Sequence, residues 1–145
     1  DKLEVVQLLE ERMSMGEFPG YSSLMLDYRQ LLHVFSHELA EWRSALSSVK
    51  GVYVITDTSC GKLYVGGAYG TGGFWERWSD YAKTSHGKNK ELRELLRKRG
   101  KAHAEKFRFA ILEVCDVKAT KDEVIARETH WKRTLQTREY GYNAN

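Results

Sequence analysis

The chain has 145 residues and a formal net charge of +3, with 41% apolar and 30% charged residues. This length suits one compact domain with its own core, and the composition is that of an ordinary globular protein, which argues against a disordered or fibrous chain. No apolar run approaches the roughly 18 residues of a membrane span, and the acidic N-terminus does not resemble a signal peptide. We therefore expect no membrane association.

Cysteine content and charge indicate the compartment and the kind of partner. Cys60 and Cys115 lie far apart, and neither belongs to a CxxC pair, which favours a reduced, cytoplasmic setting. Residues 1–50 hold five Lys/Arg and eight Asp/Glu, whereas residues 51–145 hold eighteen and twelve. A basic C-terminal two-thirds suits a polyanionic partner, although a modest excess is also common in ordinary proteins.

The first fifty residues are predicted to form a helical extension packed on the rest of the chain. Apolar residues at three- and four-residue intervals predict one amphipathic helix over 2–14 and another over 29–48. Between them, the only proline predicts a loop, and the sequence LMLDY is compatible with a short strand.

Residues 51–66, GVYVITDTSCGKLYVG, predict two strands joined by a polar turn. Each strand carries one tyrosine, Tyr53 and Tyr64. Side chains alternate faces along a strand, so the register decides whether the two phenols share a face beside Gly66 or point in opposite directions. The following residues 66–73, GGAYGTGG, predict a flexible loop, which either lets a substrate approach the backbone or is a bare linker.

The rest of the chain predicts three helices and one strand. A helix over FWERWSDYAKT places Arg77 on a mostly aromatic side, where it either faces a substrate or merely covers Trp rings. A basic helix then ends near Gly100, and FRFAILEVC predicts a third, mostly buried strand. The last helix begins near Lys121, with Thr120 as its N-cap.

Glu128 is the strongest single indication of chemistry in the sequence. It lies in the apolar stripe of the last helix, four residues after Val124 and three before Trp131. A carboxylate that points inward is costly unless it is paired or coordinates a metal. Glu128 therefore either belongs to a functional site or forms a buried salt bridge, with Arg77 or Arg133 as the expected partner.

An ordered set of residues resembles the GIY-YIG nuclease superfamily. The set comprises GVY at 51–53, YVG at 64–66, Arg77, Glu128 and Asn143. The resemblance implies an α+β fold, in which a small three-stranded mixed or antiparallel sheet is flanked by helices over residues 51–145, with residues 1–50 as the extension. It also implies a metal-dependent endonuclease that hydrolyses phosphodiester bonds in DNA. Gly67 departs from the serine that often follows the second motif.

The resemblance also implies a role for each of these residues. Glu128 would ligate one Mg²⁺ or Mn²⁺, and Arg77 would clamp the scissile phosphate. Tyr53 would act as general base or orient the water, Tyr64 would be able to exchange that role, and both would share a face over which Arg77 and Glu128 close. Three residues would support them: Lys62 as a cation that favours phenolate, Tyr81 in positioning the water, and Asn143 through hydrogen bonds.

The basic segment is expected to bind the DNA backbone, with an ordinary solvated helix face as the alternative. Its cations are Lys88, Lys90, Arg93, Arg97, Lys98 and Arg99. A non-catalytic nucleic-acid-binding or interaction module of the same fold is the competing function, and the chain could also be the catalytic part of a larger enzyme. Cleavage of both DNA strands could involve a homodimer.

Overall fold

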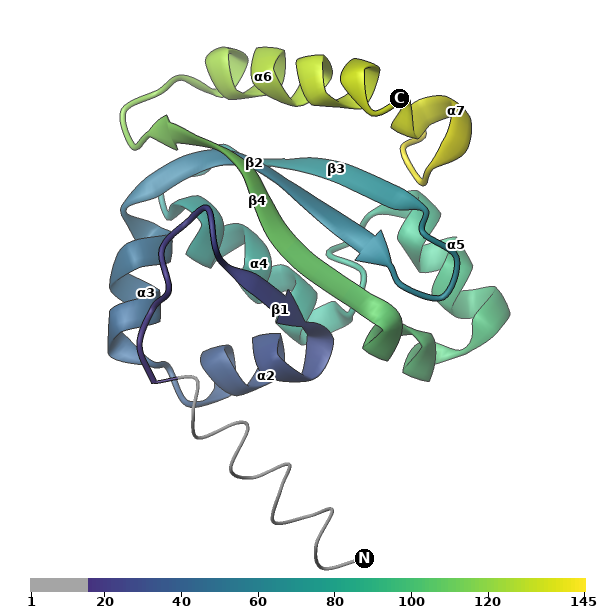
Figure 1. The fold of residues 1–145 in the computed structure, drawn as a ribbon, viewed down its shortest axis with the longest axis horizontal. Helices are drawn as coiled ribbons and strands as arrows, with labels where there is room; N and C mark the ends of the chain where they lie inside the picture. Colours follow the sequence, from purple (N-terminus) through teal and green to yellow (C-terminus); the bar gives the residue numbers. More distant parts are fainter. Residues whose placement is uncertain (1–15) are drawn as a thin grey trace, which may run out of the picture.

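A four-stranded antiparallel sheet forms the centre of the protein (Figure 1). The computed structural model describes residues 16–145, so the helix predicted over 2–14 lies outside the described residues. The spatial order of the strands is β1-β4-β2-β3. Their bounds are Met25–Asp27 for β1, Val49–Asp57 for β2, Leu63–Ala68 for β3 and Phe107–Asp116 for β4.

The structure confirms the α+β class, but the sheet has four strands where the sequence predicted three. The additional strand, β1, comes from the LMLDY segment of the N-terminal extension and pairs with β4, with Leu26 opposite Phe109. Both of these side chains are buried in the main core. The extension therefore completes the sheet as well as adding helices to it.

Seven helical segments surround the sheet within residues 16–145, and none of them is long and apolar enough to cross a membrane. They are α2 (Tyr28–Ser36), α3 (Ala40–Ser47), α4 (Gly73–Thr84), α5 (Lys90–Arg99), the 3-10 helix η1 (Lys101–Lys106), α6 (Lys121–Thr134) and α7 (Thr137–Tyr140). The single helix predicted over 29–48 is wrong. Glu38 has a φ of +44°, outside the right-handed helical region, and it separates α2 from α3.

Helices cover both faces of the sheet. In Figure 1, α4 lies on one face and α6 runs along the other. The larger core, on the α4 side, includes Trp78 and Phe109, whereas the smaller core packs Val54 and Val65 against Trp131 of α6. The edge strand β3 therefore lies where side chains from both layers can meet.

Local signals in the sequence placed several element ends correctly. Thr120 caps α6 by accepting a hydrogen bond from the backbone N–H of Glu123 at 3.1 Å. Gly100, with a φ of +96°, ends α5. The glycine-rich loop is shorter than predicted, because β3 continues through Ala68.

Candidate active site

A polar cleft of about 420 Å³ lies along the edge strand β3. Side chains from β2, β3, α4 and α6 line it, so both layers of the protein contribute. Four of the residues predicted from the sequence are among them: Tyr53, Tyr64, Arg77 and Glu128. The cleft therefore brings together residues that span most of the chain.

The two tyrosines lie on the same face of the sheet. Tyr53 is opposite Gly66, and Tyr64 is opposite Ile55, so the register places both phenols on the α4 side. A Cβ atom on Gly66 would come within 2.5 Å of the Tyr53 ring and hydroxyl. The glycine of the second motif is therefore needed so that the Tyr53 ring can lie across β3.

Arg77 on α4 is held in one position by its hydrogen bonds. Its Nε donates to the Tyr53 hydroxyl at 3.2 Å, and its Nη2 donates to the Tyr81 hydroxyl at 3.3 Å. Its Nη1 donates to the Gly87 carbonyl at 2.9 Å and to the Asp80 carboxylate at 3.3 Å. These bonds use four of the five guanidinium N–H groups. The side chain is 25% exposed, so the remaining N–H is available to an anion that enters the cleft.

Tyr53 and Tyr81 have no exposed surface, and their hydroxyls are 2.9 Å apart. Burial raises the pKa of both phenols, and although Arg77 lowers the pKa, it does not offset burial in either case. Both therefore stay protonated at neutral pH. Although Tyr53 borders the cleft, its hydroxyl lies beneath Arg77, so it acts in this conformation as a support for the guanidinium.

Tyr64 is the phenol that reaches the solvent of the cleft. It is 9% exposed, while Tyr53 is fully buried. Burial raises the pKa of Tyr64, Arg77 lowers it, and the charge of Glu128 raises it. Tyr64, rather than Tyr53, is therefore the phenol that a molecule in the cleft can contact directly.

Glu128 reaches the cleft from the opposite face of the sheet. The sequence placed Arg77 and Glu128 over one face, but only Arg77 comes from the tyrosine side. Glu128 extends from α6 across the edge of β3, where a Cβ atom on Gly67 would come within 2.7 Å of its Oε1 atom. The glycine that departs from the family serine therefore provides the space for this carboxylate.

The ion-pair partner of Glu128 is Lys132, which the sequence analysis missed. Its Nζ lies 3.0 Å from Glu128 Oε2, and the two side chains are 10% and 15% exposed. Neither Arg77 nor Arg133, the partners expected from the sequence, forms this pair in the structure. The i,i+4 spacing on α6 was a signal that could have identified Lys132.

Asn143 supports the site through the backbone of β3. It is 5% exposed, and its side chain accepts from the N–H of Val65 and donates to the C=O of Val65, both at 2.9 Å. The amide therefore bonds the edge of β3 as a neighbouring strand would, at the residue after Tyr64.

Lys62, by contrast, is exposed and lies 5.8 Å from the centroid of the Tyr142 ring, outside the cleft.

Further polar side chains in the cleft were not assigned from the sequence. Glu76 Oε2 accepts from the backbone N–H of Gly72 at 2.9 Å, and Asp80 is paired with Arg77. The lining residues that the sequence missed are Tyr69, Glu76, Asp80, Lys132 and Asn145. Glu76 and Asp80 lie one and three positions from Arg77, so the helix itself brings them to the cleft.

The residues present fit a single hard cation held mainly by water and substrate. Within residues 16–145, no group of three or more His, Cys, Asp or Glu side chains could hold a metal ion. Of the three carboxylates in the cleft, Glu76 bonds a backbone N–H and Asp80 pairs with Arg77, whereas Glu128 has open space beside its Oε1 atom at Gly67. Mg²⁺ keeps several waters and is often bound by one or two carboxylates plus phosphates, so this donor set suits Mg²⁺ or Mn²⁺ better than zinc.

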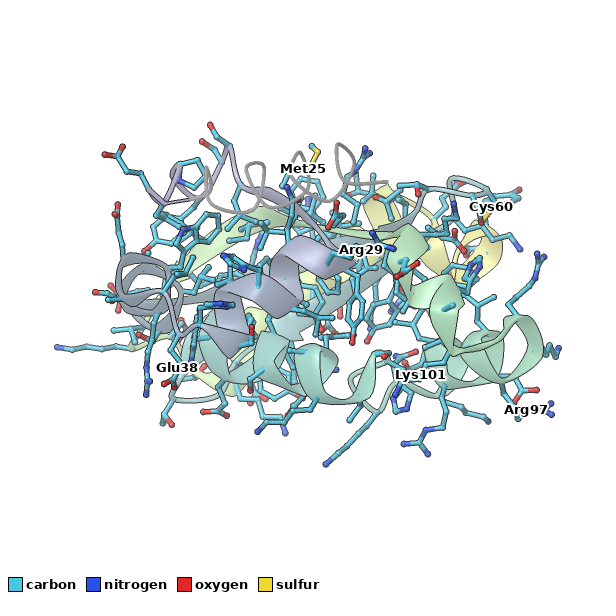
Figure 2. The ribbon with its side chains drawn as sticks, turned by 90° about the horizontal axis from the view of Figure 1, so that it is seen from below. Met25, Arg29, Glu38, Cys60, Arg97 and Lys101 are labelled. Atoms are coloured by element: carbon cyan, nitrogen blue, oxygen red, sulfur yellow. The ribbon has the colours of Figure 1, made fainter. Side chains whose placement is uncertain are left out.

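The predicted DNA-binding cations lie on and just before α5, and all are exposed. Figure 2 shows Arg97 pointing away from the protein, and its Nε donates to Glu94 at 3.0 Å. The buried face of α5 consists of Leu92 and Leu96. The structure therefore leaves this basic face accessible to a polyanion and near the Tyr64 end of the cleft, where Gly87 already contacts Arg77.

We expect Gly67→Ala to fold normally but to lose activity. The new methyl group would meet the flexible end of Glu128 at 2.7 Å and Tyr69 Cδ1 at 3.4 Å, so only the carboxylate has to move and the free energy of unfolding should fall by no more than about 1 kcal/mol. Displacing the carboxylate by about 1 Å should slow the DNA cleavage that the motif resemblance implies by roughly 10- to 100-fold. Thermal unfolding and a strand-cleavage assay on the same preparation test both statements. Unchanged cleavage would contradict the placement of Glu128.

Asn143→Ala should destabilise the protein. The substitution leaves the buried N–H and C=O of Val65 without their side-chain partner, at a cost of about 1–3 kcal/mol in the free energy of unfolding. Urea unfolding measures this loss. Tyr140→Ala is the matched control, because Tyr140 is 73% exposed in the same C-terminal segment. Equal stability of the two variants would argue against a structural role for the amide.

Phenols, a guanidinium and a carboxylate thus meet at the edge of a small antiparallel sheet, and comparison with known proteins shows the class of protein to which this arrangement belongs. The family model described as the GIY-YIG catalytic domain matches residues 49–143. A solved structure, a point mutant of the catalytic domain of intron endonuclease I-TevI, is 31% identical. The alignment covers 67% of this chain and 94% of that one, with a TM-score of 0.51.

A second structure of the I-TevI catalytic domain, a homing endonuclease, is also 31% identical over 66% of this chain and 98% of that one, with a TM-score of 0.47. No curated protein sequence matches the chain significantly. The chain belongs to the GIY-YIG family and is a GIY-YIG-type endonuclease. This confirms the resemblance that the ordered motif set indicated.

Proposed function

We propose that the chain hydrolyses phosphodiester bonds in DNA with the help of one divalent metal ion. The observation that carries the proposal is the meeting of Arg77 and Glu128 in one cleft from opposite faces of the sheet. A guanidinium suits the charge of a phosphate, and a carboxylate suits a cation that binds the same phosphate. The likeness to the catalytic domain of an intron endonuclease supports DNA as the substrate.

Tyr64 faces the attacking water in this proposal. The water oxygen forms a bond to phosphorus while the bond to one ester oxygen breaks. As phenolate, Tyr64 accepts a hydrogen bond from the water, which orients it, and then takes its proton, while the leaving oxygen takes a proton from solvent. Because burial raises the pKa of Tyr64, a nearby cation is needed to favour the phenolate. Tyr53 and Tyr81 hold the guanidinium that provides one such charge.

Arg77 stabilises the negative charge that develops on the phosphate oxygens in the transition state. Its geometry is set before substrate binds, so little reorganisation is needed when the reaction occurs. Glu128 would hold the Mg²⁺ or Mn²⁺, which when bound would polarise the phosphate and stabilise the leaving oxygen. Lys132 neutralises Glu128 and keeps the carboxylate oriented towards the cleft.

A plasmid-nicking assay tests this function. The chain should convert supercoiled DNA to nicked or linear forms with Mg²⁺ or Mn²⁺, and EDTA should stop the reaction. The competing function, a non-catalytic nucleic-acid-binding module, predicts salt-dependent binding without metal-dependent cleavage. Product formation distinguishes the two, because only the nuclease changes the covalent structure of the plasmid.

A further inference from the structure

Tyr69 is the most exposed aromatic side chain at the cleft. It follows β3 directly and is 39% exposed, whereas Tyr53, Tyr64 and Tyr81 are at most 9% exposed. Single exposed aromatics are common on protein surfaces and need no explanation. The position of Tyr69 in the cleft wall and its contact with a lysine make this one different.

Lys121, the first residue of α6, lies against the Tyr69 ring. Its Nζ is 5.0 Å from the ring centroid, a distance at which a cation is attracted to an aromatic face. A Cβ atom on Gly67 would lie 3.4 Å from Tyr69 Cδ1 and 2.7 Å from Glu128 Oε1. The ring therefore lies beside the carboxylate that we assign to the metal, and it carries a positive charge at one face.

The Tyr69–Lys121 pair and the basic helix α5 lie at opposite ends of the cleft. Tyr64 interacts with Asn89, the N-cap of α5, whereas Tyr69 and Lys121 lie at the C-terminal end of β3. A nucleic-acid strand along the edge of β3 would have its backbone near the α5 cations at one end. At the other end it would meet an aromatic ring with a lysine beside it. Proteins that bind unpaired nucleotides commonly combine these two features.

We propose that Tyr69, with Lys121, forms a stacking platform for an unpaired nucleobase next to the scissile phosphate. This inference rests on the proposed function and narrows its substrate class. A base inside a regular duplex is stacked on its neighbours and cannot also stack on Tyr69. The preferred substrate is therefore DNA that has an unpaired or flipped nucleotide at the cleavage site, such as a mismatch, a bulge or a single-stranded junction.

The test is a binding cycle in the Glu128→Gln background without divalent metal, so that cleavage does not compete with binding. Two fluorescent duplexes are compared by anisotropy: one holds a single unpaired base, and the other holds an abasic site at the same position. With Tyr69 present, the base-containing duplex should bind roughly 5- to 150-fold tighter, the range for stacking one base on an aromatic side chain. With Tyr69→Ala this ratio should fall to near one, and with Tyr69→Phe it should persist.

Tyr140→Ala serves as the control, because Tyr140 is an exposed tyrosine that does not line the cleft, and it should leave the ratio unchanged. An equal ratio for the parent and Tyr69→Ala would overturn the platform while leaving the nuclease proposal standing. Cleavage activity in the Glu128-containing protein is measured separately. If that protein neither binds nor cuts DNA, the proposed function fails and the platform fails with it.

Discussion

Glu128→Gln should reduce metal-dependent DNA cleavage by about 10³-fold or more, because a bound cation contributes several kcal/mol to stabilising the transition state. Glutamine keeps the size of the side chain above Gly67 but carries no charge for the cation. Gel-based cleavage with Mg²⁺ and with Mn²⁺ measures the effect.

The control for Glu128→Gln is DNA binding without metal, which should be retained because the α5 cations are unaffected. The substitution also leaves Lys132, 10% exposed, without its carboxylate partner, so a modest loss of stability is expected. Thermal unfolding must show that the variant is folded at the assay temperature. A folded variant that cuts DNA at the wild-type rate would exclude Glu128 as the metal ligand.

Arg77→Ala should have the second large effect, on both activity and stability. Loss of an arginine that stabilises a transferring or cleaved phosphate typically costs about 10³- to 10⁵-fold in rate. The substitution also removes hydrogen bonds to Tyr53, Tyr81 and the Gly87 carbonyl. The Tyr53 and Tyr81 hydroxyls still bond each other, but the Gly87 carbonyl loses its partner at a cost of about 1–3 kcal/mol, so the melting temperature should fall clearly.

Arg77→Lys separates the two effects. Lysine keeps the positive charge but lacks the planar fork that binds two phenols and a carbonyl at once. We expect it to recover part of the lost stability and little of the lost activity. If Arg77→Lys restored wild-type cleavage, charge alone would explain the role of Arg77, and the geometry of its hydrogen bonds would not matter for catalysis.

The sequence predicted the local elements well because their signals are short-range. The turn after β2, the N-cap Thr120 and the end of α5 at Gly100 each depend on a few neighbouring residues. The break at Glu38 was missed, because the apolar pattern continues through it and hides the change in backbone conformation. The strand β1 was left undecided because its pairing with β4 links segments about eighty residues apart.

The sequence identified the main residues of the site but not how they are arranged in space. The ordered motifs identified the phenols, Arg77 and Glu128, yet their spacing could not show that Glu128 reaches the cleft from the other face of the sheet. That depends on α6 packing against Val54 and Val65, a tertiary contact with no local signal. The exposed surface of Tyr64 and the ion pair of Lys132 likewise depend on how distant elements meet.

The most direct test of the central claim, that these residues form one nuclease site, is the plasmid-nicking rate of Tyr64→Phe with Mg²⁺. The matched control is Tyr28→Phe, which likewise removes one tyrosine hydroxyl. The Tyr28 hydroxyl is buried, 3.0 Å from Ser85 Oγ, and Tyr28 does not line the cleft. We predict a drop of roughly 10²- to 10⁴-fold for Tyr64→Phe and a near wild-type rate for Tyr28→Phe. Equal rates for both variants and the wild-type protein would contradict the account.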